Sequence, residues 1–259
     1  MNGVFALRYA YRTASQRGEH FYGHVPDCCG DYPIDYFTWV VIDDDRTIVI
    51  DAGFTPQTAL ERGSRPYLAT PLELLERLGR RAEDVTDLIV THLHYDHTGF
   101  IDAYPGARVW LQRAELDFWT SPLADRGSFA HLKHEADIAG LRALTGSERL
   151  VLLEGDAAID ERVSAHLVGG HTPGMQVVRV ETDEGPIVLA SDASHFYANL
   201  EGDHPYGILY DLGDMYRAFD RLTELAGERG VVVPGHDPRV RERHDAIDAE
   251  GRIVRLRAR

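Results

Sequence analysis

The feature that most constrains this chain is a short stretch, residues 90–99, in which metal-binding side chains directly follow an apolar segment. Residues 87–90 have the apolar, β-branched character of a buried strand. Three histidines and one aspartate come next, at positions His92, His94, Asp96 and His97. His92 and His94 alternate by two and so point to one side of an extended segment, whereas the other two can face a second point. Because zinc and similar metals take imidazole and carboxylate ligands readily, the stretch predicts a turn that serves two adjacent metals.

Three further candidate ligands each stand at the end of an apolar run. His171 lies in a glycine-rich turn, whereas Asp192 and His236 each follow a run of aliphatic residues. Taken singly, each is explained as a turn residue or a capped strand end. Together with the first stretch they make five histidines and two aspartates. That is about the number that two four- to five-coordinate metals need when they share one carboxylate.

The composition excludes several classes of partner. A formal net charge of −15 argues against a nucleic-acid groove and against an anionic membrane surface. No stretch approaches the eighteen apolar residues of a transmembrane helix, and residues 1–16 lack the apolar core of a signal peptide. The adjacent Cys28 and Cys29 are expected to stay as thiols, because neighbouring cysteines rarely pair. The sequence therefore predicts a cytoplasmic protein that acts on a small molecule and binds neither nucleic acid nor membrane.

Strand-like and helix-like segments alternate without a linker or a break in composition, which predicts one domain over residues 1–259. Thr70 and Pro71 predict the cap and first turn of a helix that ends at Gly79. Strands interleaved with helices twice over predict two sheets packed face to face with helices outside. The other expected segments are a hairpin at 37–42 and 47–50, strands at 5–12, 108–111, 150–153, 163–168, 176–181, 186–190 and 231–233, helices at 114–119, 123–144 and 214–226, a long loop at 13–33, and a tail at 239–259 that forms one helix or strand.

The ligand order resembles that of the metallo-β-lactamase fold superfamily. The resemblance rests on His92-x-His94-x-Asp96-His97, followed by His171, Asp192 and His236. It implies an α/β fold, a four-layer αββα sandwich in a single domain, with the site along one edge. It also implies that His92, His94 and His171 hold one divalent metal ion, and that Asp96, His97 and His236 hold the other. Asp192 and a hydroxide would bridge the two ions, for which Zn²⁺ is favoured and Fe or Mn are alternatives.

Within that superfamily the chain most resembles the N-acyl homoserine lactonase branch. The segments that agree are residues 91–99, 112–115, 171–174 and 192–194. One departure concerns a tyrosine that these lactonases usually carry three residues after the bridging aspartate. Here that position is His195, and Tyr197 follows two residues later. The hydrogen bond to the substrate carbonyl is therefore assigned to His195, to Tyr197 or to neither.

The resemblance and the ligand set together predict a hydrolase that opens a lactone. The bridging hydroxide attacks the carbonyl carbon, because binding to metal lowers the pKa of water to near neutral. Asp96 or Asp192 carries the proton to the leaving oxygen. The substrate is expected to be uncharged, since such an ester needs no basic pocket. Candidates for the pocket wall are Phe21, Tyr22, Tyr36 and Phe196.

Other functions and roles stay open on the same residues. The fold also suits a thioesterase-like hydrolase, an iron-dependent persulfide dioxygenase or a non-catalytic binding module, and the full ligand set with both aspartates favours two metals over one. Asp51 is interpreted equally as a turn former or as a residue that holds a neighbouring loop. His131 and His134 are expected on a solvated helix face rather than at a metal. The oligomeric state is open, and a homodimer is one alternative.

Overall fold

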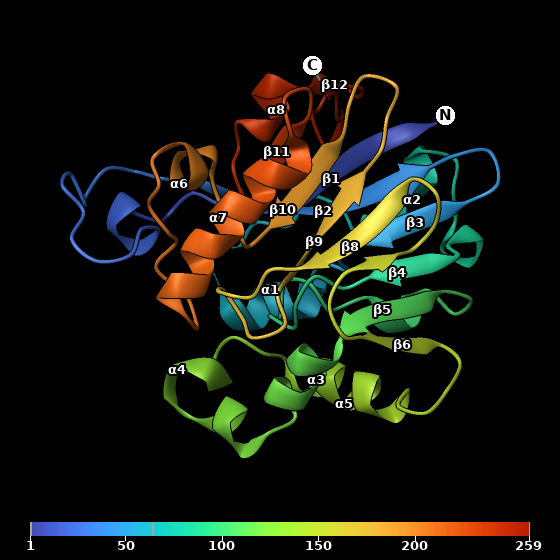
Figure 1. Ribbon diagram of the computed structural model, residues 1–259, viewed down its shortest axis with the longest axis horizontal. Coiled ribbons are helices and arrows are strands. Elements are labelled where there is room, and N and C mark those ends of the chain that lie inside the picture. Colours follow the sequence, from blue (N-terminus) through green and yellow to red (C-terminus); the bar gives the residue numbers. More distant parts are fainter. Residues whose placement is uncertain (1, 64, 259) are drawn as a thin grey trace.

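The computed structural model describes residues 2–63 and 65–258, which form two β-sheets. In the larger sheet eight strands follow the order β12-β13-β1-β2-β3-β4-β5-β6, and in the smaller one five strands follow the order β11-β10-β9-β8-β7 (Figure 1). The strands are β1 (Gly3–Arg12), β2 (Ile34–Ile42), β3 (Thr47–Ile50), β4 (Asp87–Ile89), β5 (Arg108–Gln112), β6 (Leu150–Leu153), β7 (Ala157–Ala158), β8 (Val163–Leu167), β9 (Gln176–Val180), β10 (Ile187–Ser191), β11 (Val231–Pro234), β12 (Asp245–Ala246) and β13 (Ile253–Arg255). The helices are α1 (Pro56–Arg62), α2 (Pro71–Arg77), α3 (Arg113–Trp119), α4 (Gly127–Ala130), α5 (Glu135–Ala143), α6 (Tyr197–Glu201), α7 (Leu212–Ala226) and α8 (Val240–Arg243).

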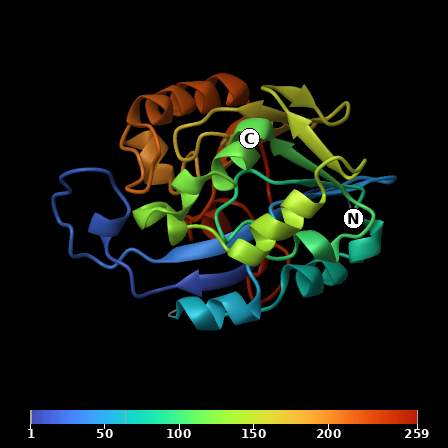
Figure 2. The same ribbon diagram turned by 90° about the horizontal axis from the view of Figure 1, so that it is seen from below.

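Three apolar interfaces stack these elements into four layers. Alternate residues of β1 face opposite ways, so that Phe5 and Leu7 pack toward the helices while Val4 and Ala6 pack toward the second sheet. A third cluster joins the other face of the smaller sheet to α7. Figure 2 shows α7 on one outer side and α1 and α2 on the opposite one, with the strands between them. The predicted αββα sandwich is therefore confirmed.

Local sequence explains how several of these elements begin and turn. Thr70 caps α2, its hydroxyl accepting from the Glu73 N–H while the Glu73 carboxylate accepts from the Thr70 N–H. β2 and β3 pair as the predicted hairpin, and Asp43 closes the turn by accepting from the Arg46 N–H. Helix α7 buries Met215, Phe219 and Leu222 along one face, as the 3.6-residue pattern predicts.

Two segments differ from the prediction. The expected helix at 123–144 is broken into a 3-10 turn (Pro122–Asp125), α4 and α5. His131 ends α4 and His134 precedes α5, so the two do not share a helix face. The tail forms both α8 and a strand pair, and β13 lies beside β1 because edge pairing satisfies its backbone groups.

The strand directions gather the candidate ligands at one edge. β3, β4, β5 and β6 are parallel neighbours, and β10 and β11 are parallel in the other sheet. Loops that leave the carboxyl ends of parallel strands meet at the same edge of a sheet.

Cys28 and Cys29 are exposed and unpaired, as expected. Within the described part of the chain, every helix is too short or too polar to cross a lipid bilayer.

Candidate metal centre

All seven candidate ligands lie together where strands from both sheets end. Their ligand atoms fall into two groups, each with its atoms within 4.8 Å of one another. The first group is His92, His94, His171 and Asp192, and the second is Asp96, His97 and His236. A further group of the same kind joins Asp192 and His236 to His195. The four candidate ligands within residues 92–97 follow β4, Asp192 follows β10, and His236 follows β11. The grouping matches the division that the sequence resemblance implies.

Asp192 faces both groups, one carboxylate oxygen to each. Its Oδ2 lies 3.2 Å from His171 Nε2 and 3.6 Å from His92 Nε2. Its Oδ1 lies 2.9 Å from His236 Nε2 and 3.5 Å from His97 Nε2. Ligand atoms around a tetrahedral zinc ion stand roughly 3.3–3.4 Å apart, which follows from metal–nitrogen distances of about 2.0–2.1 Å. These spacings therefore suit a carboxylate shared by two ions.

A hydrogen bond on the second ring nitrogen fixes the orientation of three of the histidines. His97 Nδ1 lies 2.8 Å from Asp51 Oδ2. His171 Nδ1 lies 2.8 Å from the carbonyl oxygen of Ile208, and His236 Nδ1 lies 2.9 Å from that of Asp35. Because Nδ1 donates in each case, Nε2 is the ring nitrogen that points into the cluster and is available to bind a metal.

Two buried nitrogen atoms support the fit to a metal. Among the described residues, His92 Nε2 and His97 Nε2 are buried and have no hydrogen-bond partner. His94 Nδ1 and His171 Nε2 lie 3.0 Å apart, which is close to the separation expected for two ligands of one cation. Buried polar atoms are normally satisfied, so these point to an ion as the missing partner.

Opposing charges set the protonation of the cluster. Burial, reinforced by the imidazoles of His97 and His94, lowers the pKa of His92 well below its usual value and keeps it neutral. Burial also disfavours charge on His97, but the carboxylates of Asp51, Asp192 and Asp96 raise its pKa to about 10. Without a cation, a proton on His97 thus offsets the negative charge of the carboxylates. A divalent ion would take over that role and displace the proton.

Asp51 holds the loop that carries the first ligands. Its carboxylate accepts from the Thr91 N–H at 2.7 Å and from the Thr91 hydroxyl at 2.8 Å, besides its bond to His97. Asp51 and Ser191 both have positive φ, 60° and 45°, a strained conformation that concentrates at functional sites. Of the two interpretations of Asp51, the structure supports the one in which it holds a neighbouring loop.

Glu115, in α3, ties the two ligand loops of the first group together. One carboxylate oxygen accepts from the Leu93 N–H and from Trp119 Nε1, at 2.9 and 2.7 Å. The other accepts from the Thr172 hydroxyl and the Gly174 N–H, both at 2.8 Å. Sequence reasoning did not assign this role, although Glu115 belongs to a segment on which the lactonase resemblance rests. A Cβ on Gly174 would lie 2.3 Å from the Glu115 nitrogen, so only glycine allows this approach.

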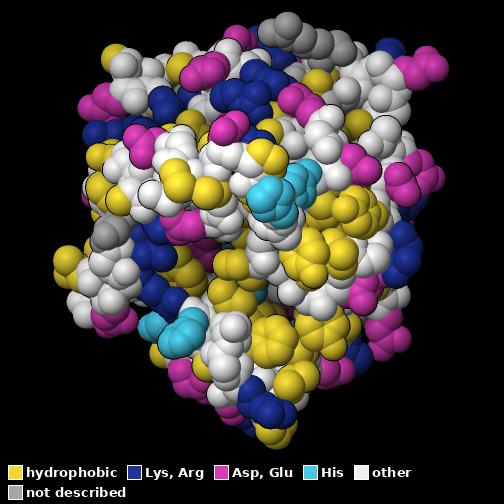
Figure 3. All heavy atoms as spheres, turned by 90° about the vertical axis from the view of Figure 1, so that its left-hand side faces the viewer, with side chains coloured by type: hydrophobic (Ala, Val, Ile, Leu, Met, Phe, Trp, Pro, Cys, Tyr) yellow, Lys and Arg dark blue, Asp and Glu magenta, His cyan; other side chains and the backbone are white. Residues whose placement is uncertain are grey.

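A cavity of about 230 Å³ opens onto the cluster. Figure 3 shows the face of the molecule that carries the 13–33 loop, hollowed near its middle between basic and hydrophobic side chains. Tyr36, one of the four predicted wall residues, lines the cavity, but Phe21, Tyr22 and Phe196 do not. The remaining lining includes Arg12, Ile34, Arg62, Arg65, Tyr95, His131, Leu132, Tyr206 and Ile208.

His195 and Tyr206 form the inner wall of the cavity. The two rings stack in parallel, with centroids 3.3 Å apart and planes inclined by 7°. His195 Nε2 lies 2.9 Å from Asp192 Oδ2, while Nδ1 is buried and has no partner among the described residues. Burial lowers the pKa of His195 to about 3, so the neutral ring donates to Asp192. Burial and then the charge of Asp192 raise the pKa of Tyr206, a residue that sequence reasoning missed.

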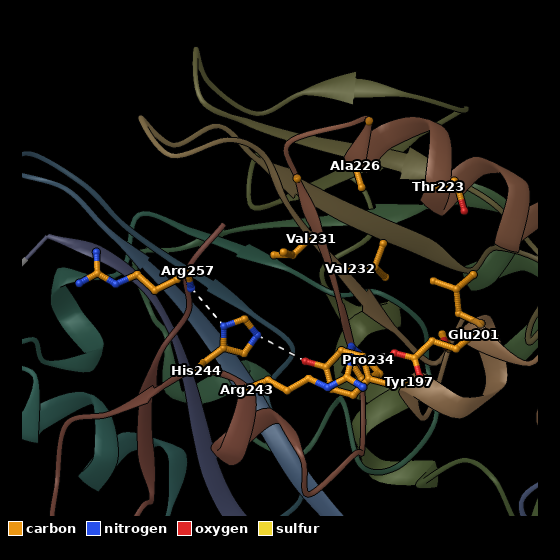
Figure 4. Close-up of a pocket in the computed structure, with 14 residues that line it drawn as sticks. Tyr197, Glu201, Thr223, Ala226, Val231, Val232, Pro234, Arg243, His244 and Arg257 are labelled. Carbon is orange, nitrogen blue, oxygen red and sulfur yellow. Dashed lines mark hydrogen bonds and ion pairs between the residues drawn. The ribbon is translucent and has the colours of Figure 1, made fainter. Parts of the chain in front are cut away.

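Tyr197 does not reach this cavity. Its ring packs beneath Arg243, and its hydroxyl lies 3.4 Å from His244 Nε2. Tyr197, Arg243 and His244 line a separate cavity of about 550 Å³, which Figure 4 shows between α7, β11 and the C-terminal segment. The sequence prediction of Tyr197 as a donor to the substrate is therefore not supported, because residue 197 begins α6 and turns away from the cluster.

Comparisons with known proteins agree with this geometry. Residues 32–236 match the family model of the metallo-beta-lactamase superfamily. An N-acyl homoserine lactonase of a Bacillus species is 30% identical over 168 residues, which cover 64% of this chain and 61% of the relative. The match thus spans about three-fifths of the length of that relative.

Solved structures extend the likeness over the whole fold. The crystal structure of a quorum-quenching N-acyl homoserine lactone lactonase superposes with a TM-score of 0.74 at 20% identity, covering 92% of each chain. AidC, described as a dizinc quorum-quenching lactonase in complex with a product, superposes with a TM-score of 0.68 at 19% identity, covering 92% of this chain and 89% of AidC. At such identities the likeness shows the fold alone.

Proposed function

The chain belongs to the metallo-beta-lactamase superfamily, and from this membership we propose that it is a dinuclear metal-dependent hydrolase that opens a lactone ring. The observation that carries the proposal is Asp192, whose two oxygens each face a separate group of ligands. The N-acyl homoserine lactonases among the relatives support the choice of a lactone. We further propose that residues 1–259 act as one hydrolase domain.

The ligand set decides how two ions would be held. Zinc is favoured, because imidazole and carboxylate ligands suit it and AidC is described as a dizinc enzyme. When bound, the ions would supply Lewis-acid chemistry, in that they would polarise an ester carbonyl and lower the pKa of a water toward neutrality. The residues that would hold them are His92, His94 and His171 for one ion, Asp96, His97 and His236 for the other, and Asp192 for both.

The protein's own side chains would place the substrate and move the proton. Tyr206 is one of three tyrosines that line the cavity, with Tyr36 and Tyr95, and it is the one whose ring stacks on His195. Burial, and then the charge of Asp192, keeps its hydroxyl protonated. It would therefore donate a hydrogen bond to an oxygen of the substrate, the role that sequence reasoning gave to Tyr197 or His195. His195 instead donates to Asp192 and so orients the shared carboxylate. Asp96 or Asp192 would carry the proton to the leaving oxygen.

A substrate screen tests this function. Purified protein reconstituted with zinc is incubated with N-acyl homoserine lactones of several acyl lengths, γ-butyrolactone and a linear thioester, and acid release is followed with a pH indicator. We expect one acid released per lactone opened, and loss of that activity in Asp192→Asn. No hydrolysis of any lactone or ester would overturn the proposal. A single iron per chain with oxygen uptake would indicate the dioxygenase alternative. The cytoplasmic location and the homodimer stay predictions.

A further inference from the structure

We propose that the lactone opened at this site carries a carboxylate, which Arg62 and Arg65 bind at the wall of the cavity. The inference rests on the proposed function and replaces the uncharged ester expected from the sequence. Its basis is an excess of positive charge in one place: both arginines line the cavity that opens onto the metal cluster, in a chain with a net charge of −15.

Within the described part of the chain, neither guanidinium has an anionic partner. Among the described residues, Arg62 donates to the carbonyl oxygens of His131 and Lys133. Arg65 donates to the Tyr95 hydroxyl at 2.9 Å and to the carbonyl oxygens of Arg62 and Gly63, both at 2.8 Å. No carboxylate of the described chain lies within ion-pair distance of either. Arg12, on the same cavity, differs because it pairs with Glu19 at 2.7 Å.

The two positive charges also lie close to each other. The Arg62 guanidinium carbon lies over the ring of Tyr95, 3.9 Å from its centroid. The Arg65 guanidinium carbon lies 5.5 Å from the same centroid, and its Nε donates to the Tyr95 hydroxyl. Both side chains are half-buried. Half-buried like charges without a counterion are unfavourable, so their joint placement at a cavity points to an anion supplied by the ligand.

The free donors match a carboxylate. A guanidinium has five N–H donors in a planar fork, and here carbonyl oxygens and the Tyr95 hydroxyl use only some of them among the described residues. The remaining donors suit the two oxygens of one carboxylate. Burial opposes the charge of Arg65, but Tyr95, then Tyr36 and last Asp96 raise its pKa. Asp96 forms no ion pair with Arg65, and we assign it to the metal group. The substrate's carboxylate and its reacting ester would therefore lie at neighbouring parts of one cavity.

A matched pair of substrates tests the inference. N-succinyl homoserine lactone ends in a carboxylate, and N-succinamoyl homoserine lactone ends in the amide of the same shape; glutaryl and adipoyl pairs vary the reach. We expect kcat/KM to be about tenfold to a hundredfold higher for the acid, as one charge-assisted contact provides. Arg62→Gln and Arg65→Gln should reduce that ratio toward one with the amide still hydrolysed, whereas Arg81→Gln, on an exposed turn, should keep it.

A binding measurement separates this inference from the proposed function. The lactam analogues of the same pair are titrated into the protein by calorimetry, with and without zinc. Tighter binding of the acid lactam, lost in Arg65→Gln, supports the arginine site even if no lactone is hydrolysed. Equal affinity for the acid and the amide, or an Arg65→Gln variant that loses both substrates equally, would overturn it and leave these arginines a structural role.

Discussion

Replacing Glu115 by glutamine tests whether one buried carboxylate holds the first metal group in shape. The change keeps the size of the side chain but turns one acceptor oxygen into an NH₂ group. Glu115 is fully buried and accepts four hydrogen bonds, two on each oxygen. In either orientation of the amide, at least one N–H donor of the site loses its acceptor and meets another donor.

The structure gives the size of the expected loss. If the NH₂ group faces Leu93, both that N–H and Trp119 Nε1 are unsatisfied; if it faces Gly174, the Thr172 hydroxyl can rotate but the Gly174 N–H cannot. Each unsatisfied buried donor costs about 1–3 kcal/mol. Burial raises the pKa of Glu115, so removing the charge recovers a part of that. We expect a net decrease of about 2–4 kcal/mol in the free energy of unfolding.

Two assays check the Glu115 prediction. Urea denaturation of zinc-loaded protein measures the free energy of unfolding, and chelator competition measures zinc affinity, which we expect to fall about tenfold to a hundredfold. Glu154→Gln is the matched control, since that side chain is 73% exposed and, among the described residues, pairs with Arg113 alone. Equal stability and equal zinc affinity in Glu115→Gln and the control would refute the positioning role.

Three further predictions follow from the same contacts. Asp51→Asn should weaken binding of one metal ion about tenfold to a hundredfold, because His97 loses the carboxylate that orients it; chelator competition measures this, and unchanged affinity would contradict it. Tyr206→Phe should lower kcat about tenfold to a hundredfold while Tyr197→Phe leaves it unchanged, and the reverse order would restore Tyr197 as the donor. Burial opposes ionisation of Asp87, but bonds from Trp110 and other donors lower its pKa. The stability that ionised Asp87 provides is therefore complete above its ordinary pKa of 3.8 and is lost as the pH falls below that value. Asp87→Asn should lower the free energy of unfolding by about 3 kcal/mol at pH 7, and by progressively less when thermal unfolding is measured at acid pH.

The layers and the ligand groups were predictable because their signals are local. A strand such as β4 is marked by its own apolar residues, and the ligands that follow it are neighbours in sequence. The parallel order of β3 and β4 then brings Asp51 beside Thr91. The division into two groups needed the family resemblance as well, because alternation alone assigns only His92 and His94.

What sequence reasoning missed depends on contacts between distant segments. Glu115 joins loops 22 and 57 residues away, and nothing in α3 itself marks that role. Tyr206 reaches the cavity from a loop, whereas Tyr197, nearer to Asp192 in sequence, is turned away by the start of α6. Arg62 and Arg65 look like ordinary charged residues around the end of α1, and only the fold places them together at the cavity.

The metal content of the purified protein tests the central claim most directly. The natural protein and the His97→Ala variant are saturated with zinc and freed of excess metal. Their zinc content per chain is then measured by inductively coupled plasma mass spectrometry. Two ions per chain are expected for the natural sequence and one for His97→Ala, because that histidine belongs to only one of the two ligand groups. A single ion per chain in the natural sequence, or none, would contradict a shared Asp192 and the dinuclear chemistry built on it.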